Sequence, residues 1–383
     1  MEVKDPLKRY IKRYPEDFIV KEILPFELSK ESKKYTYYKL KKKNKSTLEA
    51  IEEIGRTLEV PLYKIGFAGL KDKSGITSQY ISIEYGPPRN AYGKGWELKF
   101  IGYHDYPLEI GKINKNLFIV TIRDFENREK IREAIEFVRS WGFVNYFGEQ
   151  RFLRAFRGQT SIGKLILENK IEEALKFYLT TTPNPHMTKR LEKLYGKWDL
   201  FLQEATHLTP REKAAVKTLK RSRDILKAFR ALPKNVKLML IFSYQSYLWN
   251  KLVKILVSKH FSHFKVPFVI DKVLYFYNRV NRENEYLMKV NIPYISEKVL
   301  DYEIPKTIKE EMLRIIEAEE LDGKLNYKVA NVKFFNEGER AFVVLPEGLE
   351  KLEENRRIIR LKFTLPTGSY GTVLLRKIIF WRN

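Results

Sequence analysis

The chain has 383 residues, with 72 Lys and Arg against 48 Asp and Glu, so its formal net charge is +24 at pH 7. A charge of this size attracts polyanions, and nucleic acid is favoured over a membrane surface because neither terminus is a basic amphipathic helix. The absence of Cys excludes disulfides, thiolate metal sites and Cys nucleophiles. The 24 Phe and 23 Tyr supply rings on which the bases of single-stranded RNA stack.

The first third of the chain mixes strands with one helix. Runs of alternating or β-branched apolar residues predict strands over residues 18–24, 35–43, 80–83 and 117–122. Ser46 and Glu49 have the spacing of a capping box, so a helix is expected to begin there and to end at Pro61. The connection between this helix and the next strand is rich in glycine and carries Asp72, and functional groups often lie in such loops.

Helical patterns dominate the middle of the chain. They cover residues 129–141, 161–179, 209–232, 235–257 and 305–320. Gly142 suits a left-handed cap of the first of these helices, and Thr209 and Pro210 suit the N-cap and first turn of the third. Polar side chains interrupt the fourth, so no membrane span is predicted. The N-terminus has no apolar signal core, and the protein is expected to be cytoplasmic.

A basic stripe lies on the predicted helix 209–232. Lys220, Arg223, Lys227 and Arg230 fall within one quarter of its helical wheel. This spacing suits contacts with successive phosphates, and a solvated helix face is the alternative interpretation.

The end of the chain is rich in β-structure. Short apolar runs predict strands over residues 266–277, 342–345, 358–365 and 373–380. The simplest architecture therefore joins both ends of the chain in one α+β unit, with a helix-containing domain inserted between them.

Several enzyme classes can be excluded from the motifs. There is no phosphate-binding G-x-x-x-x-G-K-[ST] loop and no dinucleotide-binding G-x-G-x-x-G after a strand. The five His show no metal-ligand spacing, and His260 and His263 are interpreted as a surface pair. An enzyme that needs no cofactor, or a protein that only binds RNA, remains.

The loop around Asp72 is the strongest candidate for chemistry. Asp72 lies between Lys71 and Lys73, with Gly69 and Gly75 close by. Neighbouring positive charges favour the ionised form of a carboxyl group, and an ionised Asp can act as a nucleophile or a base.

Two further segments carry features of RNA binding. Residues 145–152 combine amides, aromatic rings and a guanidinium, which suits a planar base, although Phe147 and Phe152 could simply be core residues. Residues 66–69 match the G-x-x-G pattern of a KH-type RNA clamp, and this short match keeps a non-catalytic RNA-binding protein in view.

Four segments together resemble the TruD family of tRNA pseudouridine synthases. They are Lys12 with residues 15–18 (K-x-x-P-E-D-F), residues 68–79 (A-G-x-K-D-K-x-x-x-T-x-Q), residues 145–152 (N-Y-F-G-x-Q-R-F) and residues 365–372 (L-P-x-G-S-Y-x-T). A weaker match covers residues 244–250. The resemblance implies an α+β fold, in which residues 1–160 and 340–383 form a catalytic domain with a mixed, mainly antiparallel sheet. Residues 161–339 would form an inserted, helix-rich α/β domain.

The resemblance also implies the activity, which is isomerisation of uridine to pseudouridine, typically at position thirteen in the D-arm of tRNA. Asp72 would be the nucleophile, attacking either the sugar or the base of a flipped-out nucleotide. No metal and no organic cofactor would be required, and the protein would act on tRNA as a monomer, without a membrane or a protein partner.

The same resemblance assigns roles to the substrate-binding residues. Phe147 would stack on the uracil, and Asn145 would hold Asp72 or the edge of the base. Lys71 and Lys73 would steer phosphate and keep Asp72 charged. The complete implied set is Lys12, Phe18, Lys71, Lys73, Asn145, Phe147, Gln150 and Arg151.

The chain departs from the family pattern at two positions. Leu153 stands where Gly is usual, and Gly75 where Ala is common. A non-catalytic RNA chaperone, and a nuclease or glycosylase that uses Asp72, are the alternatives to the isomerase.

Overall fold

The structure is a computed structural model that describes residues 5–71, 75–152, 154–158, 160–299 and 301–382. The chain divides into two compact units. The sheet unit comprises Pro6–Gly142 and Val344–Trp381, and the helical unit comprises Phe143–Val343 with Asp5 and Arg382. Residues 145–152 therefore belong to the helical unit. The proposed limits of an inserted domain, 161 and 339, stay a prediction.

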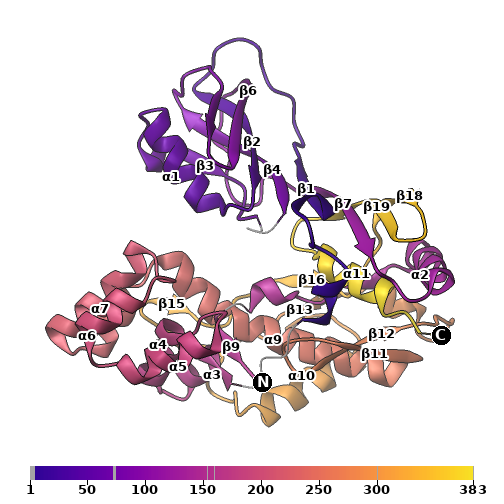
Figure 1. Ribbon diagram of the computed structural model, residues 1–383. Coiled ribbons are helices and arrows are strands. Elements are labelled where there is room, and N and C mark those ends of the chain that lie inside the picture. Colours follow the sequence, from indigo (N-terminus) through magenta and orange to yellow (C-terminus); the bar gives the residue numbers. More distant parts are fainter. Residues whose placement is uncertain (1–4, 72–74, 153, 159, 300, 383) are drawn as a thin grey trace. The chain divides into compact units, whose positions relative to one another are not determined.

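Strands from both ends of the chain form the sheet (Figure 1). Among the described residues it has nine strands, in the order β18-β19-β7-β1-β4-β2-β6-β5, with β3 beside β4. They are β1 (Phe18–Ile23), β2 (Tyr35–Lys43), β3 (Ile65–Phe67), β4 (Ile76–Glu84), β5 (Ala91–Gly93), β6 (Trp96–His104), β7 (Lys115–Arg123), β18 (Glu347–Glu354) and β19 (Ile358–Pro366). Of the pairings between these described strands, only that of β1 with β4 is parallel, so the predicted mixed, mainly antiparallel sheet is confirmed.

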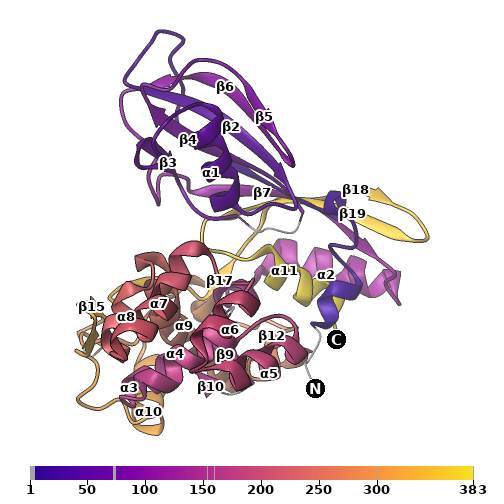
Figure 2. The same cartoon turned by 60° about the vertical axis from the view of Figure 1, so that its left-hand side comes forward.

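The register of β19 explains how the two ends of the chain meet. β19 pairs with β7 along its whole length, and β7 pairs in turn with β1 (Figure 2). Phe363 and Phe118 face each other across the first pair with their rings stacked, and Phe118 also meets the ring of Phe18 edge-on. Such cross-strand aromatic contacts stabilise a sheet and fix its register.

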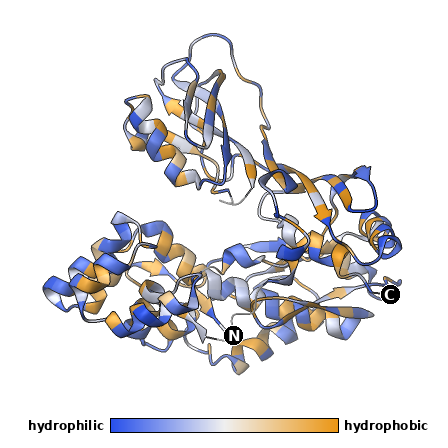
Figure 3. Ribbon diagram, viewed as in Figure 1, coloured by the Kyte–Doolittle hydropathy of each residue, from blue (hydrophilic) through white to orange (hydrophobic). Residues whose placement is uncertain are grey.

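Helix α1 (Thr47–Thr57) covers one face of the sheet. Ser46 and Glu49 form the predicted capping box, in which each side chain accepts a hydrogen bond from the backbone N–H of the other residue. Apolar and polar residues alternate along α1 (Figure 3), and its apolar side chains pack in one core with those of β2, β4 and β6. Helices α2 (Arg128–Trp141) and α11 (Gly371–Ile379) contact each other in the same unit.

The helical unit contains the remaining helices. They are α3 (Ile162–Leu167), α4 (Ile171–Thr180), α5 (Pro185–Leu194), α6 (Trp198–Glu204), α7 (Pro210–Ser222), α8 (Ile225–Ala231), α9 (Lys234–His260) and α10 (Lys306–Ala318). Its strands are short: β8 (Phe143–Val144), β9 (Phe156–Arg157), β10 (Thr160–Ser161), β11 (His263–Pro267), β12 (Val273–Tyr277), β13 (Asn291–Pro293), β14 (Lys328–Val329), β15 (Val332–Lys333) and β16 (Glu339–Ala341), with β17 (Val343–Val344) at the unit boundary. In the described part of the chain, no helix combines the length and the apolar character that a membrane crossing requires.

Three segments predicted as continuous elements are broken in the structure. The helix predicted over 209–232 ends at Ser222, because Arg223 is left-handed, and Asp224 caps the new helix α8. Asn169, with φ of 60°, separates α3 from α4. Residues 266–277 form a hairpin, because Asp271 and Lys272 are both left-handed and reverse the chain. Each break needs positive φ, which polar residues tolerate without a strong sequence signal.

The strand predicted over residues 373–380 is wrong, because residues 373–379 belong to helix α11 and Phe380 is its C-cap. Nearly all side chains of α11 are buried, including those of Val373, Leu375 and Ile378. A short apolar run is compatible with a buried strand as well as with a buried helix, and the pattern of so few residues does not distinguish the two.

Candidate active site

Asp72 and Lys73 lie outside the described residues, but the chain on both sides of them is held in place. On one side, the Lys71 N–H donates to Thr47 Oγ1 at 3.0 Å. On the other, the Gly75 N–H donates to Asn44 Oδ1 at 3.2 Å, and the Asn44 N–H donates to the Gly75 carbonyl at 3.1 Å. Residues 44–47, at the start of α1, therefore hold both Lys71 and Gly75, the residues that flank positions 72–74.

A buried polar network supports this anchor. The Thr47 hydroxyl donates to Gln79 Oε1 at 2.8 Å, and Gln79 Nε2 donates to the Gly69 carbonyl at 3.4 Å. Thr47 and Gln79 are both buried, so their polar groups need partners inside the protein. The network joins α1, β4 and the loop that leads to Asp72.

The ammonium group of Lys71 points at a buried carboxylate. Its Nζ lies 2.8 Å from Glu22 Oε1, and the Glu22 side chain has no solvent exposure. Glu22 Oε2 accepts a hydrogen bond from the Tyr80 N–H at 2.7 Å. Burial, and then the charge of Glu22, raise the pKa of Tyr80. A buried carboxylate is destabilising unless it is paired and hydrogen-bonded, and Lys71 supplies its cation.

Lys12 and Phe18, from the first motif, contact each other directly. Lys12 adopts a left-handed backbone with φ of 60°, and its Nζ lies 4.0 Å from the centroid of the Phe18 ring. The second motif touches the same residue, because a Cβ atom at Gly75 would lie 2.5 Å from the Phe18 carbonyl oxygen. The first two motifs are therefore packed against each other in the sheet unit.

The fourth motif reaches the same region through Asn116. Asn116 Oδ1 accepts a hydrogen bond from Lys71 Nζ at 3.1 Å, and its Nδ2 donates to Thr367 Oγ1 at 3.5 Å. The Thr367 hydroxyl donates to the Ile113 carbonyl at 2.8 Å. The sheet unit thus brings together residues of three motifs that are widely separated in the sequence.

The third motif lies in the helical unit, where Arg340 holds Asn145. Arg340 Nε donates to the Asn145 carbonyl and its Nη2 donates to Asn145 Oδ1, both at 2.7 Å. Asn145 Nδ2 donates in turn to the Ala341 carbonyl at 3.2 Å. These bonds fix the orientation of the Asn145 amide against β16, the strand that carries Arg340 and Ala341.

Phe147 is packed within this unit and is only 6% exposed. The guanidinium of Arg340 lies 4.2 Å from its ring centroid, and Trp249 meets the ring edge-on. Asn250 bonds both the N–H and the carbonyl of Phe147. Of the remaining candidates, Arg151 donates from Nε to Ser246 Oγ at 2.9 Å, and Gln150 precedes it in the same turn.

Four residues that hold the candidate site were missed in the sequence: Glu22, Thr47, Asn116 and Arg340. Glu22 lies on an alternating strand in phase with Phe18 and Val20, and this position on the apolar face was the signal that the sequence offered. Their partners are distant in the chain, so no local pattern could identify these contacts.

Comparisons with known proteins identify the family. The model of the family "tRNA pseudouridine synthase D (TruD)" matches residues 3–378. The chain is 38% identical to tRNA pseudouridine synthase D of Aquifex aeolicus, over 96% of this chain and 97% of the relative. It is 33% identical to the Pyrococcus furiosus relative, over 96% of this chain and 95% of that protein.

A solved structure agrees with this assignment at the level of the fold. The crystal structure of a TruD protein from Methanosarcina mazei superposes with a TM-score of 0.65, covering 97% of this chain and 93% of that one at 24% identity. The protein described here therefore belongs to the tRNA pseudouridine synthase D family.

Proposed function

We propose that this protein isomerises uridine to pseudouridine in tRNA, at uridine 13 of the D-arm, with Asp72 as the nucleophile. The observation that carries the proposal is that residues 44–47 hold both Lys71 and Gly75, on either side of Asp72, within a chain that matches the family model almost throughout. A nucleophile must be held in a defined position to lower the barrier to attack, and anchors on both of its sides meet this requirement.

The reaction needs no net oxidant or reductant. The C1′–N1 bond of the uridine breaks, the uracil rotates, and a C1′–C5 bond forms, while C5 loses its proton and N1 gains one. Asp72 would attack either C1′ or the base ring and would be released at the end. The target nucleotide has to leave its stack first, at a cost of roughly a few kcal/mol.

The neighbours of Asp72 would position it. Lys71 is already paired with Glu22, so we propose that it anchors the backbone before Asp72, while its positive charge helps to keep the Asp72 carboxylate ionised. Lys73 would attract the phosphates. Lys12 and Phe18 would line the pocket beside Gly75, which their packing in the sheet unit supports.

The third motif would receive the base. Phe147 would stack on the uracil, and because its ring is 6% exposed, the side chains packed on it would have to move to admit the base. Asn145 would use the second hydrogen of Nδ2, since the first is bound to the Ala341 carbonyl. Gln150 and Arg151 would complete the substrate-binding set. We further propose that the catalytic domain comprises residues 1–160 and 340–383, that residues 161–339 are an insertion, and that the enzyme acts as a cytoplasmic monomer.

The decisive variant is Asp72→Asn, which removes the nucleophile and keeps the size of the side chain. With unmodified tRNA transcripts, the wild-type protein should form pseudouridine at position 13, mapped at nucleotide resolution. The variant should form none, while its Kd for tRNA should change little, because the basic surface is intact. Normal turnover by the Asn variant would exclude Asp72 as the nucleophile.

The same experiment separates the alternatives. A glycosylase or nuclease would release free uracil or cleave the strand, and chromatography of the wild-type reaction would reveal either product. An RNA chaperone would bind tRNA with a steep salt dependence and form no pseudouridine under any condition.

A further inference from the structure

A strongly basic surface lies on α7, α8 and the first turn of α9. Between Thr209 and Lys237 the chain has ten Lys or Arg and only two acidic residues. The exposed residues Lys217, Arg221, Arg223, Lys227, Arg230 and Lys234 are called the basic ridge below.

The two acidic residues of this segment are engaged elsewhere. Glu212 is buried, binds Arg154 at 2.7 Å and accepts a hydrogen bond from the Thr209 N–H at the start of α7. Asp224 caps α8 by accepting a hydrogen bond from the Lys227 N–H at 2.8 Å. Neither forms an ion pair with a residue of the basic ridge.

The positive charges of the basic ridge do not contribute to the stability of the fold. Within the described chain, no member of the basic ridge forms an ion pair, although Lys220 beside them pairs with Asp199. Lys217 and Arg221 are four residues apart on α7, and Lys227 and Arg230 are three apart on α8. Like charges at these spacings destabilise a helix by a few tenths of a kcal/mol per pair. The basic ridge is therefore maintained at a cost to stability.

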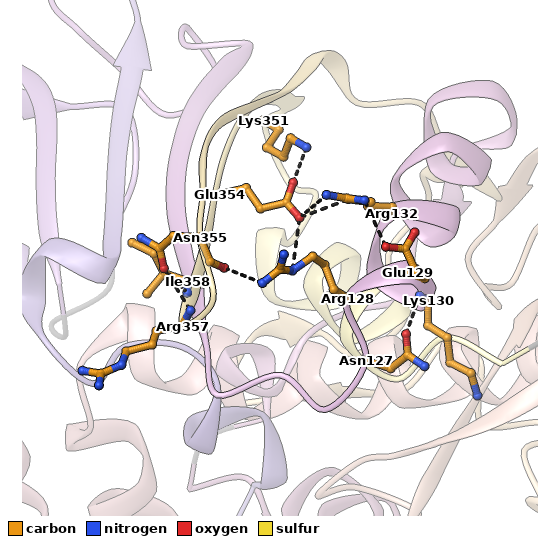
Figure 4. Close-up of polar contacts among 10 residues, drawn as sticks. All are labelled: Asn127, Arg128, Glu129, Lys130, Arg132, Lys351, Glu354, Asn355, Arg357 and Ile358. Carbon is orange, nitrogen blue, oxygen red and sulfur yellow. Dashed lines mark hydrogen bonds and ion pairs between the residues drawn. The ribbon is translucent and has the colours of Figure 1, made fainter.

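Helix α2 of the sheet unit shows the opposite arrangement (Figure 4). Arg132 lies 2.9 Å from Glu354 and 3.0 Å from Glu129, and Arg128 also pairs with Glu354. Lys351 contacts the same carboxylate. Within the part of the chain that the structure describes, the arginines of α2 are thus paired with carboxylates, whereas the side chains of the basic ridge form no ion pair.

The helices that carry the basic ridge are packed against the rest of the helical unit. The opposite side of α7 buries Val216 and Leu219, and α8 buries Ala228 and Phe229. Arg223 is left-handed and sets the angle between the two helices. Among the large apolar side chains of residues 209–237, Leu226 is exposed, with 46% of its surface accessible to solvent. A membrane-binding helix would present a continuous apolar face, so this surface suits phosphates in water rather than a lipid bilayer.

We propose that the basic ridge binds the ribose-phosphate backbone of the RNA substrate and contributes to its affinity, but not to the chemical step. The inference rests on the proposed function for the identity of the ligand. Exposed Lys and Arg side chains on a rigid helical surface contact phosphates without reading sequence, and they release counterions when they do so.

The test is a triple variant, Lys217→Gln/Arg221→Gln/Lys227→Gln, compared with wild type in the binding of an unmodified tRNA transcript. We expect Kd to rise about tenfold or more at physiological salt, and the slope of log Kd against log salt to fall by about two to three. At saturating tRNA, kcat should stay within about twofold of wild type, because the reacting groups are unchanged.

The control is Lys130→Gln/Arg132→Gln/Arg139→Gln on α2, which removes the same charge from a helix whose arginines are already paired. Circular dichroism would confirm that both variants are folded. If the control weakens tRNA binding as much as the ridge variant does, net charge alone explains the effect and the proposal is overturned.

Two further outcomes are informative. Loss of binding to phosphatidylserine vesicles with unchanged affinity for tRNA would overturn the proposal in favour of a membrane surface. The binding measurement does not require turnover, so the ridge is still tested if the wild-type protein forms no pseudouridine. Conversely, an unchanged Kd in the ridge variant would overturn the proposal for the basic ridge and would leave the assignment of Asp72 intact.

Discussion

At the scale of single residues, the site depends on a close backbone approach at a glycine and on buried polar side chains that have defined partners. Gly75, which follows the 72–74 segment, has φ of 111°, and a Cβ atom there would lie 2.5 Å from the Phe18 carbonyl oxygen. A side chain at position 75 would therefore require the backbone to move. Thr47 and Glu22 are equally constrained, because each has a buried polar group with a defined partner.

We expect Gly75→Ala to reduce stability by about 1–3 kcal/mol and to lower kcat, because relief of the clash must move the backbone beside Asp72. Denaturant unfolding and single-turnover kinetics would measure the two effects. Gly111→Ala is the matched control, since Gly111 also has positive φ but a Cβ there would meet nothing within 4 Å. Equal losses in the two variants would show that backbone strain, and not the contact with Phe18, is responsible.

At the scale of elements, α3, α9 and α10 of the helical unit meet at one carboxylate. Glu319, at the end of α10, accepts contacts from Lys164 at 2.9 Å, from Lys251 at 2.7 Å and from the Tyr244 hydroxyl at 2.8 Å. Burial opposes ionisation, but the hydrogen bonds from Lys251, Lys164 and Tyr244 outweigh it and lower the pKa of Glu319. Tyr244 and Lys251 both lie on α9, so this contact ties the longest helix to its neighbours.

The lowered pKa gives a prediction for acid stability. Because the pKa of Glu319 is lower in the folded state than its ordinary value of 4.5, its contribution is complete above that pH and is lost as the pH falls through the folded pKa. Glu319→Gln should therefore cost about 2 kcal/mol at pH 7, and the difference from wild type should shrink in acid. Unfolding in denaturant at several pH values would measure this. Glu317→Gln, on the exposed side of α10, should change little, and a pH-independent loss in Glu319→Gln would contradict the ion-pair explanation.

At the scale of the whole molecule, the net charge of +24 dominates the encounter with RNA. Because binding to phosphates releases counterions, the affinity of the wild-type protein for tRNA should fall steeply, by about a hundredfold or more between about 50 mM and 200 mM salt. Once tRNA is saturating, kcat should respond far less. Filter binding and steady-state kinetics across this range would check both statements. An affinity that hardly depends on salt would show that the charge is not used to bind RNA.

The sequence by itself determined the family, the α+β class and the positions of most strands. These properties depend on local information: motif letters, caps such as Ser46 with Glu49, and the period of apolar residues. It failed where a break needed positive φ at Arg223 or Asn169, and where the apolar run of α11 was too short to distinguish a buried helix from a buried strand.

Only the tertiary structure decided which residues support the site. Glu22, Asn116 and Arg340 acquire their roles from partners tens to hundreds of residues away, at distances set by the sheet register and by packing. Likewise, the sequence shows that residues 209–237 are basic, but ion pairing on the folded surface decides which of those charges are available to a ligand. Local patterns describe the neighbours of a residue along the chain, and chemistry depends on its neighbours in space.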